Sequence, residues 1–180
     1  IVTIFFGSTS SNRLLAENKL AFLLGVQNYE RAPLRNPIND VRLMSSVLSK
    51  IGFDVVGFKD LTYSGFKQKF SQFTKKIKPT STVLFYFSGH GFQYNGINIL
   101  VPLGANQASK YIKLDNIMSQ MDGARFGVKL IFIDACRNIP IVRNQFSTIR
   151  NITSEGFGDM NTVMGTVIAF ATSPGKLASD

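Results

Sequence analysis

Short apolar runs alternate with helix-patterned segments along this 180-residue chain, and this alternation is what most restricts its fold. Five strand-like runs are present, at Lys19–Val26, Phe53–Phe58, Val83–Phe87, Val128–Ile133 and Thr166–Ala171. Continuous apolar runs of this length are typical of strands that are covered on both faces. Strands that alternate with helices predict an α/β fold, with a mainly parallel central sheet and helices on both faces.

Helices are predicted in the segments between these strands. The first begins near Asn36, and its apolar residues recur with helical period until Gly52. A second is expected over Phe66–Lys78, ended by Pro79, and a third over Leu114–Met121. Because ligands of such sheets bind at the carboxyl ends of the strands, a functional site is expected at that edge.

The composition fits one compact domain, since 44% of the residues are hydrophobic and 17% are charged. The single cysteine cannot form an internal disulfide, and one cysteine with one histidine is too few ligands for a zinc site. No apolar run approaches the roughly 18 residues of a membrane span. We therefore expect no structural metal and no membrane span.

The net charge of +9 suits a polyanionic partner only if the basic residues cluster. The densest basic run, Lys67–Lys78, carries phenylalanines at helical spacing, so its lysines are explained as the solvated face of an amphipathic helix. We expect no nucleic-acid partner. A nucleic-acid-binding domain is the competing interpretation, and its affinity would fall steeply with rising salt.

The domain is expected over residues 19–180, preceded by a tail over residues 1–18. Ile1–Phe6 and the Gly, Ser and Thr residues after it fit the remnant of a signal peptide, and equally an ordinary strand or a tail packed on the core. The predicted compartment therefore stays open between the cytoplasm and export.

The only histidine and the only cysteine of the chain each follow a strand-like run. His90 lies between two glycines after the third run, and Cys136 follows the fourth run. Taken singly, His90 fits a capped turn and Cys136 a small buried side chain. If the two strands are neighbours, both residues lie at one sheet edge, where an imidazole can convert a thiol to a nucleophilic thiolate.

Two motifs resemble the catalytic dyad of the caspase superfamily, and they are most similar to those of paracaspases and of the bacterial metacaspase-like proteins called orthocaspases. They are Ser88-Gly89-His90-Gly91 and Asp134-Ala135-Cys136-Arg137-Asn138. His90 precedes Cys136 by 46 residues, close to the spacing of about 50 in caspases. The resemblance covers residues 19–180, because further segments match in the family's order: Leu20–Gly25, Pro37–Val41, Gly52–Val55 and Ile168–Gly175. It implies a caspase-like three-layer sandwich.

The resemblance also implies a cysteine endopeptidase. Cys136 would attack the scissile carbonyl, and His90 would act as general base and general acid. By analogy, the backbone N–H groups of Gly91 and Cys136 would form the oxyanion hole. A non-catalytic caspase-like module that binds partners is the alternative, and the retention of both dyad residues argues against it.

The pocket for the substrate's P1 side chain, S1, is implied to be acidic. Asp134 stands where the caspase motif has glutamine, and it would repel an acidic P1 residue. In paracaspases and metacaspases this acid and a second one, which matches Asp40, line S1, so a P1 arginine or lysine is expected. Apart from the resemblance, Asp40 is also a favourable charge at a helix N-terminus, and Asp134 a hydrogen-bonding group at a strand end.

No cofactor is expected, and calcium dependence in particular is not. Many metacaspases bind calcium through clustered aspartates. Apart from Asp134, which is assigned to S1, only Asp115 and Asp122 lie between His90 and Cys136, too far apart for the oxygen-rich shell that calcium prefers. The chain therefore resembles a metal-independent subtype more closely.

Residues Asn138–Met164 show no sustained period and predict a long loop. Arg143 and Arg150 in it are candidate self-cleavage sites, and ordinary solvent-facing charge explains them equally well. The family normally continues with another helix and strand beyond the position of Asp180, so the C-terminal part is expected to be truncated. Further residues or a partner subunit, such as a second copy of the chain, would complete the exposed sheet edge.

Overall fold

The computed structural model describes residues 18–136 and 165–171 of the chain. The predicted tail therefore lies outside the described residues except for Asn18, and the predicted loop over Asn138–Met164 lies outside them entirely. The described elements, in chain order, are β1 (Lys19–Gly25), α1 (Pro37–Lys50), β2 (Asp54–Lys59), α2 (Tyr63–Thr74), β3 (Thr82–Tyr94), β4 (Ile97–Leu100), η1 (Ala108–Lys110), β5 (Ile112–Lys113), α3 (Leu114–Gln120), η2 (Asp122–Ala124), β6 (Val128–Cys136) and β7 (Thr166–Phe170).

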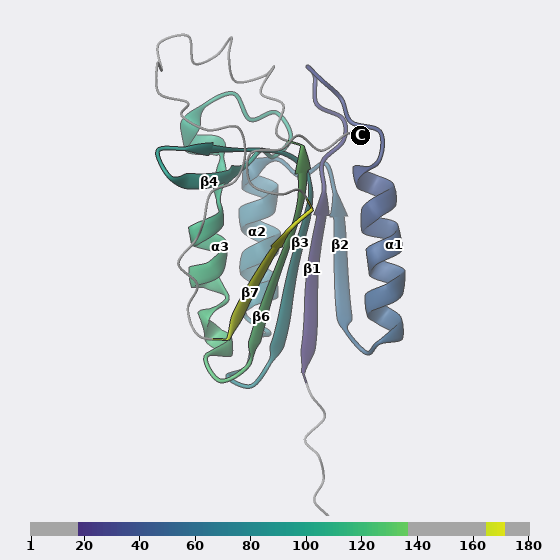
Figure 1. The fold of residues 1–180 in the computed structure, drawn as a ribbon, viewed down its shortest axis with the longest axis vertical. Coiled ribbons are helices and arrows are strands. Elements are labelled where there is room, and N and C mark those ends of the chain that lie inside the picture. Colours follow the sequence, from purple (N-terminus) through teal and green to yellow (C-terminus); the bar gives the residue numbers. More distant parts are fainter. Residues whose placement is uncertain (1–17, 137–164, 172–180) are drawn as a thin grey trace, which may run out of the picture.

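Five of the strands form a parallel sheet, as predicted, in the order β2-β1-β3-β6-β7 (Figure 1). The short strands β4 and β5 extend β3 in the antiparallel sense and form a second, smaller ladder. In a parallel sheet all carboxyl ends lie on one edge. The segments that follow β1, β3 and β6 are therefore brought to the same end of the molecule.

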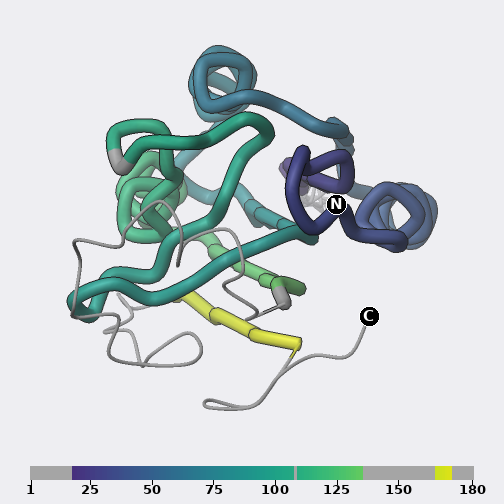
Figure 2. The backbone as a smooth tube through the Cα atoms, turned by 90° about the horizontal axis from the view of Figure 1, so that it is seen from above, coloured from purple at the N-terminus to yellow at the C-terminus, as the bar shows by residue number. Residues whose placement is uncertain are grey.

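Helices cover both faces of the sheet and give the predicted three layers (Figure 2). On one face, Val41 and Leu48 of α1 pack on Leu23 of β1 and Leu84 of β3. On the other face, α2 and α3 enclose a larger core. Each run of consecutive apolar residues in a strand supplies side chains to both cores, because successive side chains point to opposite faces.

Aromatic rings form the centre of the larger core. The ring of Phe22 in β1 is fully buried, and its centroid lies 5.1 Å from that of Phe70 in α2 and 5.9 Å from that of Phe85 in β3. The helical spacing of Phe66, Phe70 and Phe73 turns all three rings of α2 toward the sheet. Burial of each such ring contributes about 1.5–3 kcal/mol to stability.

Three predicted elements have boundaries that are wrong by three or more residues: the second helix, the third strand, and the fourth strand, which continues beyond Ile133 to Cys136. The second helix begins at Tyr63 instead of Phe66, because the hydroxyl of Thr62 accepts a hydrogen bond from the Gly65 N–H at 3.3 Å and caps its N-terminus. It ends at Thr74, before Pro79 is reached. The third strand continues beyond Phe87 to Tyr94.

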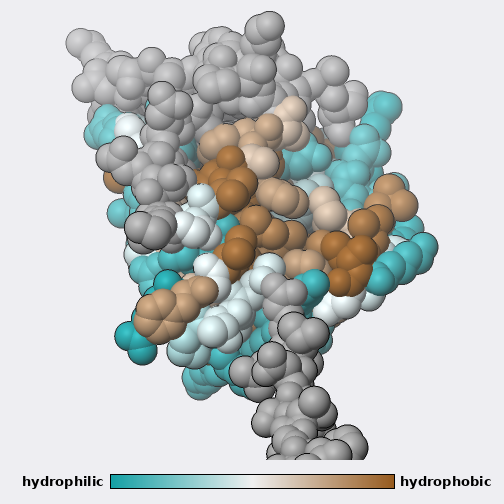
Figure 3. Space-filling model, turned by 60° about the horizontal axis from the view of Figure 1, so that its bottom comes forward, coloured by the Kyte–Doolittle hydropathy of each residue, from teal (hydrophilic) through white to brown (hydrophobic). Residues whose placement is uncertain are grey.

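The α1 face of the sheet carries exposed apolar side chains over β6 and β7. Val128 is 42% exposed and Val167 is 53% exposed, and Figure 3 shows hydrophobic side chains gathered on this side of the molecule. Within the described ranges, β7 pairs only with β6 and thus forms an edge of the sheet. None of the helices in the described part is long and apolar enough to cross a membrane.

Candidate active site

His90 and Cys136 are partners in the register that joins β3 to β6, and they form the last pair at the carboxyl ends of these strands. The expectation that the strands are neighbours is therefore confirmed. The expectation that the two residues follow their strands is wrong, since both lie within them. Polar residues and glycines end the apolar pattern at Ser88, but pairing with β4 and β6 continues the strand beyond this point.

The imidazole of His90 is held by a backbone carbonyl. Its Nε2 atom lies 2.7 Å from the carbonyl oxygen of Ala32, in the segment between β1 and α1. A carbonyl oxygen only accepts hydrogen bonds, so Nε2 carries the proton, and Nδ1 is the basic atom of the neutral ring. Ala32 has a φ of 57°, a left-handed conformation that is uncommon for a residue with a side chain. His90 itself is only 5% exposed within the chain.

Tyr29 supports His90 through both its hydroxyl and its ring. The hydroxyl accepts a hydrogen bond from the His90 N–H at 2.9 Å and donates one to the Val101 carbonyl at 2.8 Å. The two ring centroids lie 4.4 Å apart. Burial raises the pKa of Tyr29, so its hydroxyl stays protonated and able to donate. Sequence patterns give no signal for this role, because 61 residues separate the two partners.

The two aspartates predicted for S1 are brought to the same part of the sheet edge. The Oδ2 atom of Asp40, in the first turn of α1, lies 3.1 Å from the Ser88 hydroxyl. Ser88 is also the register partner of Asp134 across β3 and β6. Two acids that are 94 positions apart in the sequence thus flank one serine.

Tyr86 lies beneath this acidic pair. It is two residues before Ser88 on β3, so both side chains point to the α1 face of the sheet. Burial raises the pKa of Tyr86, and the nearby charges of Asp134 and Asp40 raise it further. A protonated hydroxyl group therefore lies below the two aspartates. Neither Ser88 nor Tyr86 was assigned to the pocket from the sequence.

Gly91, predicted for the oxyanion hole, directly follows His90 on β3 and is the register partner of Leu100 on β4. Cys136 is described through its backbone position at the end of β6, and its side chain lies outside the description. Arg143 and Arg150, the candidate self-cleavage sites, also lie outside the described residues.

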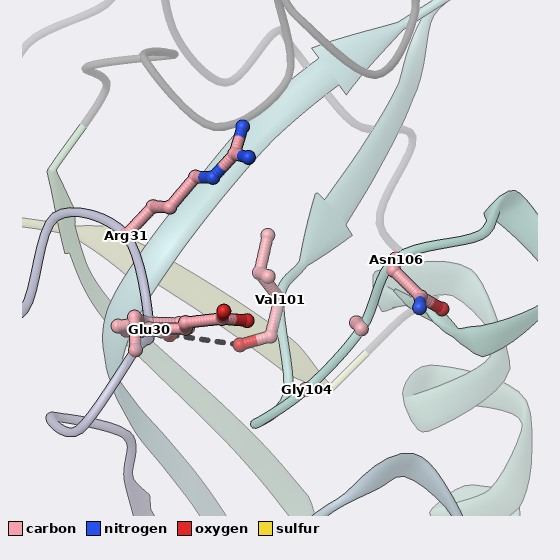
Figure 4. A pocket seen from close by; sticks show the side chains of 7 residues that line it. Glu30, Arg31, Val101, Gly104 and Asn106 are labelled. Carbon is pink, nitrogen blue, oxygen red and sulfur yellow. Dashed lines mark hydrogen bonds between the residues drawn. The ribbon is translucent and has the colours of Figure 1, made fainter.

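A cavity of about 160 Å³ borders the support of His90. Tyr29, Glu30 and Val101 contribute to its lining. In Figure 4 the Glu30 side chain extends toward Val101, and the Arg31 side chain extends away from both. The dashed line in that figure is the hydrogen bond from Tyr29 to Val101. The backbone that positions His90 is thus accessible from one side.

Asp115 and Asp122 are closer in the fold than their sequence separation indicated. Both line a second cavity, of about 140 Å³, where the Asp122 carboxylate lies 2.7 Å from the ammonium group of Lys129. The Lys129 side chain is 6% exposed, so Asp122 compensates a buried positive charge. Among residues 18–136 and 165–171, no group of three or more His, Cys, Asp or Glu side chains is suited to hold a metal ion. Independence of calcium stays a prediction.

Comparison with known proteins gives a consistent family assignment. The family model described as caspase domain matches residues 18–180. The human protein named mucosa-associated lymphoid tissue lymphoma translocation protein 1 is 28% identical over 132 residues, which cover 71% of this chain and 16% of the relative. Its mouse homologue is 28% identical over 127 residues, which cover 68% of the chain and 15% of that protein. The chain thus spans less than a fifth of the length of these relatives.

Two solved caspase structures have the same fold. Caspase-1 from Spodoptera frugiperda has a TM-score of 0.60 and 19% sequence identity, and the match covers 91% of this chain and 62% of that one. The structure described as pro-sf-caspase-1 also has a TM-score of 0.60, at 18% identity, with coverages of 88% and 63%.

Proposed function

Because this chain belongs to the caspase domain family, we propose that it is a cysteine endopeptidase that cleaves peptide bonds after arginine or lysine. One observation carries the proposal: His90 and Cys136 are register partners at the carboxyl ends of two adjacent parallel strands. Ligands of parallel sheets bind at this edge. The only thiol and the only imidazole of the chain are therefore available to one substrate.

The proposed reaction begins when Nδ1 of His90 accepts the proton of the Cys136 thiol. The thiolate attacks the scissile carbonyl carbon, and a tetrahedral oxyanion forms. His90 then returns the proton to the nitrogen of the leaving amine, the C–N bond breaks, and a thioester remains on Cys136. Water, deprotonated by His90, hydrolyses the thioester and releases the carboxylic acid product and the thiol.

The oxyanion would be stabilised by the backbone N–H groups of Gly91 and Cys136. Both residues lie at the strand ends, next to the proposed base and at the proposed nucleophile. Such preorganised donors stabilise charge that develops only in the transition state. Nucleophile, base and oxyanion donors are then all protein groups, and we propose that the reaction requires no metal or other cofactor.

Basic P1 specificity is supported by the arrangement of Asp40, Ser88 and Asp134. The contact between Ser88 and Asp40 directs one carboxylate toward the position where β6 carries the other. Two carboxylates can accept hydrogen bonds from the N–H groups of a planar guanidinium group. The same pair repels a P1 aspartate.

The proposal is tested with fluorogenic peptides that differ only at P1, carrying arginine, lysine, aspartate or leucine. We expect turnover of the arginine and lysine peptides, loss of turnover in Cys136→Ala, and selective loss for basic peptides in Asp40→Ala and Asp134→Ala. The series is repeated with calcium and with a chelator, and equal rates are expected. Turnover of the aspartate peptide alone would contradict the specificity, and unchanged turnover in Cys136→Ala would contradict the mechanism.

Self-cleavage after Arg143 or Arg150 belongs to the same proposal. Mass spectrometry of an active preparation should then detect fragments that end at one of these residues. The Cys136→Ala protein is the matched control and should stay intact. A fully active preparation that contains only intact chain would refute self-cleavage and leave the protease proposal standing.

A further inference from the structure

The segment between β1 and α1, residues 26–36, supplies two contacts that hold His90. Tyr29 binds the His90 backbone, and the Ala32 carbonyl binds its imidazole. The ring's position therefore depends on where this segment lies. We refer to residues 26–36 as the supporting loop.

One carboxylate fixes the start of the supporting loop. The Oδ1 atom of Asp60 accepts hydrogen bonds from the backbone N–H groups of Gln27 at 2.8 Å and Asn28 at 3.1 Å. Its Oδ2 atom accepts a third from the Asn28 side-chain amide at 2.7 Å. Hydrogen bonds to an ionised acceptor are stronger than those between neutral groups. Two of these bonds fix the backbone immediately before Tyr29, and the third holds the Asn28 side chain.

Asp60 is itself held firmly in place. It follows β2, its N–H donates to the Gly25 carbonyl at 2.8 Å, and it has a φ of 52°. A left-handed backbone at a residue other than glycine persists where the surrounding contacts determine it. Because β1 lies between β2 and β3 in the sheet, Asp60 reaches the supporting loop from the side opposite His90.

The backbone conformation of Ala32 depends on the anchor, by which we mean the three hydrogen bonds from the supporting loop to the Asp60 carboxylate. Its left-handed φ of 57° is unfavourable for alanine and is retained only while the supporting loop is restrained at its ends. If the restraint is lost, Ala32 can relax to a negative φ, which turns its carbonyl away from His90. The Nε2 proton then loses its partner, and the proton is no longer confined to that nitrogen.

We propose that Asp60 is a positioning residue for His90. It acts through the supporting loop, and it confines the imidazole to the tautomer in which Nε2 carries the proton. The catalytic consequence rests on the proposed function, in which Nδ1 is the base. The structural consequence, a single tautomer, does not depend on any substrate.

The single histidine of the chain makes this inference directly measurable. With histidine labelled with ¹⁵N in its ring, an NMR spectrum at a pH where the ring is neutral contains only the Nδ1 and Nε2 signals of His90. We expect one tautomer, protonated at Nε2, in the unaltered chain. In Asp60→Ala both tautomers should be populated, and kcat for an arginine-P1 peptide should fall about tenfold while KM changes little.

Two further variants separate positioning from general loss of structure. Asp60→Asn keeps an oxygen that can accept from Gln27 and Asn28, so it should restore the single tautomer and most of kcat. Asp54→Asn is the matched control at the other end of β2, where Asp54 pairs with Lys76 at 3.3 Å near the surface, and it should leave both readouts unchanged. If Asp60→Ala does not fold, Asn28→Ala replaces it, because it removes only the bond from the Asn28 amide to Oδ2 of Asp60, and a mixture of tautomers is again expected.

A single Nε2–H tautomer in folded Asp60→Ala, or in Asn28→Ala where that variant is used, would overturn the inference. Loss of the single tautomer in Asp54→Asn would overturn it as well, because the effect would then not be specific to the anchor. An unaltered chain that shows the expected tautomer but cleaves no basic peptide would contradict the proposed function and leave the anchor intact.

Discussion

The Cα atoms of His90 and Cys136 face each other as the last of nine register pairs that join β3 to β6. The pair lies at the end of the sheet where the Ala32 carbonyl holds the His90 ring and the Tyr29 hydroxyl holds its backbone. The position of His90, the proposed base, is therefore fixed by contacts within the protein that do not depend on substrate. Reactivity of the thiol can be predicted from this arrangement.

Removal of the imidazole should make Cys136 less reactive. Cys136 is the only cysteine, so iodoacetamide gives a single adduct whose rate reports the thiolate fraction. In His90→Ala at pH 7 the thiol returns toward its ordinary pKa of about 8.5, and we expect alkylation to slow by about tenfold. Equal rates in the two folded proteins, followed by mass spectrometry, would contradict an activating role for His90.

Removal of the Ser88 hydroxyl should weaken recognition of arginine. In Ser88→Ala the Asp40 carboxylate loses the partner that lies 3.1 Å from its Oδ2 atom. We expect kcat/KM for an arginine-P1 peptide to fall about tenfold, as for loss of one hydrogen bond to a charged group. Ser64→Ala, at the exposed start of α2, is the control. An unchanged arginine-to-leucine ratio in Ser88→Ala would show that Ser88 does not orient Asp40 for substrate.

A methyl group at Gly25 should displace Asp40, because Gly25 packs against the start of α1. A Cβ atom at this position would lie 2.5 Å from the Pro37 carbonyl oxygen, where β1 meets the start of α1. Gly25→Ala should therefore push α1 and Asp40 outward and cost about 1–3 kcal/mol of unfolding free energy.

Urea unfolding and kcat/KM for an arginine-P1 peptide test this prediction together, and both should fall. Gly57→Ala is the matched control, because its Cβ would meet only the Val41 side chain at 3.4 Å. Wild-type stability in Gly25→Ala would mean that the contact between β1 and α1 adapts without moving Asp40.

Alkaline pH should destabilise the fold through its buried tyrosines. Burial raises the pKa values of Tyr29, Tyr86 and Tyr111, so the native state keeps these protons above pH 10 while the unfolded chain releases them. The native state then binds more protons, and stability falls as pH rises above about 10. Tyr29 and Tyr86, whose pKa values are raised furthest, each contribute up to about 1.4 kcal/mol per pH unit to this fall, and Tyr111 contributes in the same direction.

Urea unfolding at pH 9, 10 and 11 measures the effect residue by residue. Tyr86→Phe should flatten the fall by about 1.4 kcal/mol per pH unit. Tyr94→Phe removes a hydroxyl from the same strand at a half-buried position and is the control. Parallel stability curves for wild type and Tyr86→Phe would contradict the burial of this hydroxyl beneath the acidic pair.

The architecture was largely predictable because its signals are local. Continuous apolar runs predicted all five parallel strands, and helical periodicity predicted three helices between them, since both patterns reflect burial of neighbouring residues. Apolar periodicity missed the start of α2, which a single capping hydroxyl determines. It also missed β4 and β5, whose few residues carry too little pattern. The resemblance to caspases, drawn from the two motifs, is confirmed by the family model.

The sequence by itself determined the alternating fold, the family, and the placement of the only histidine and the only cysteine near the ends of two apolar runs. The tertiary structure showed that these two runs are neighbouring strands. Only the tertiary structure decided what surrounds the two residues: Asp40 beside Ser88, Ala32 beside the imidazole, and Asp60 behind the supporting loop. Each of these contacts joins residues 33 to 58 positions apart. Such contacts depend on strand register and loop path, which no local pattern encodes.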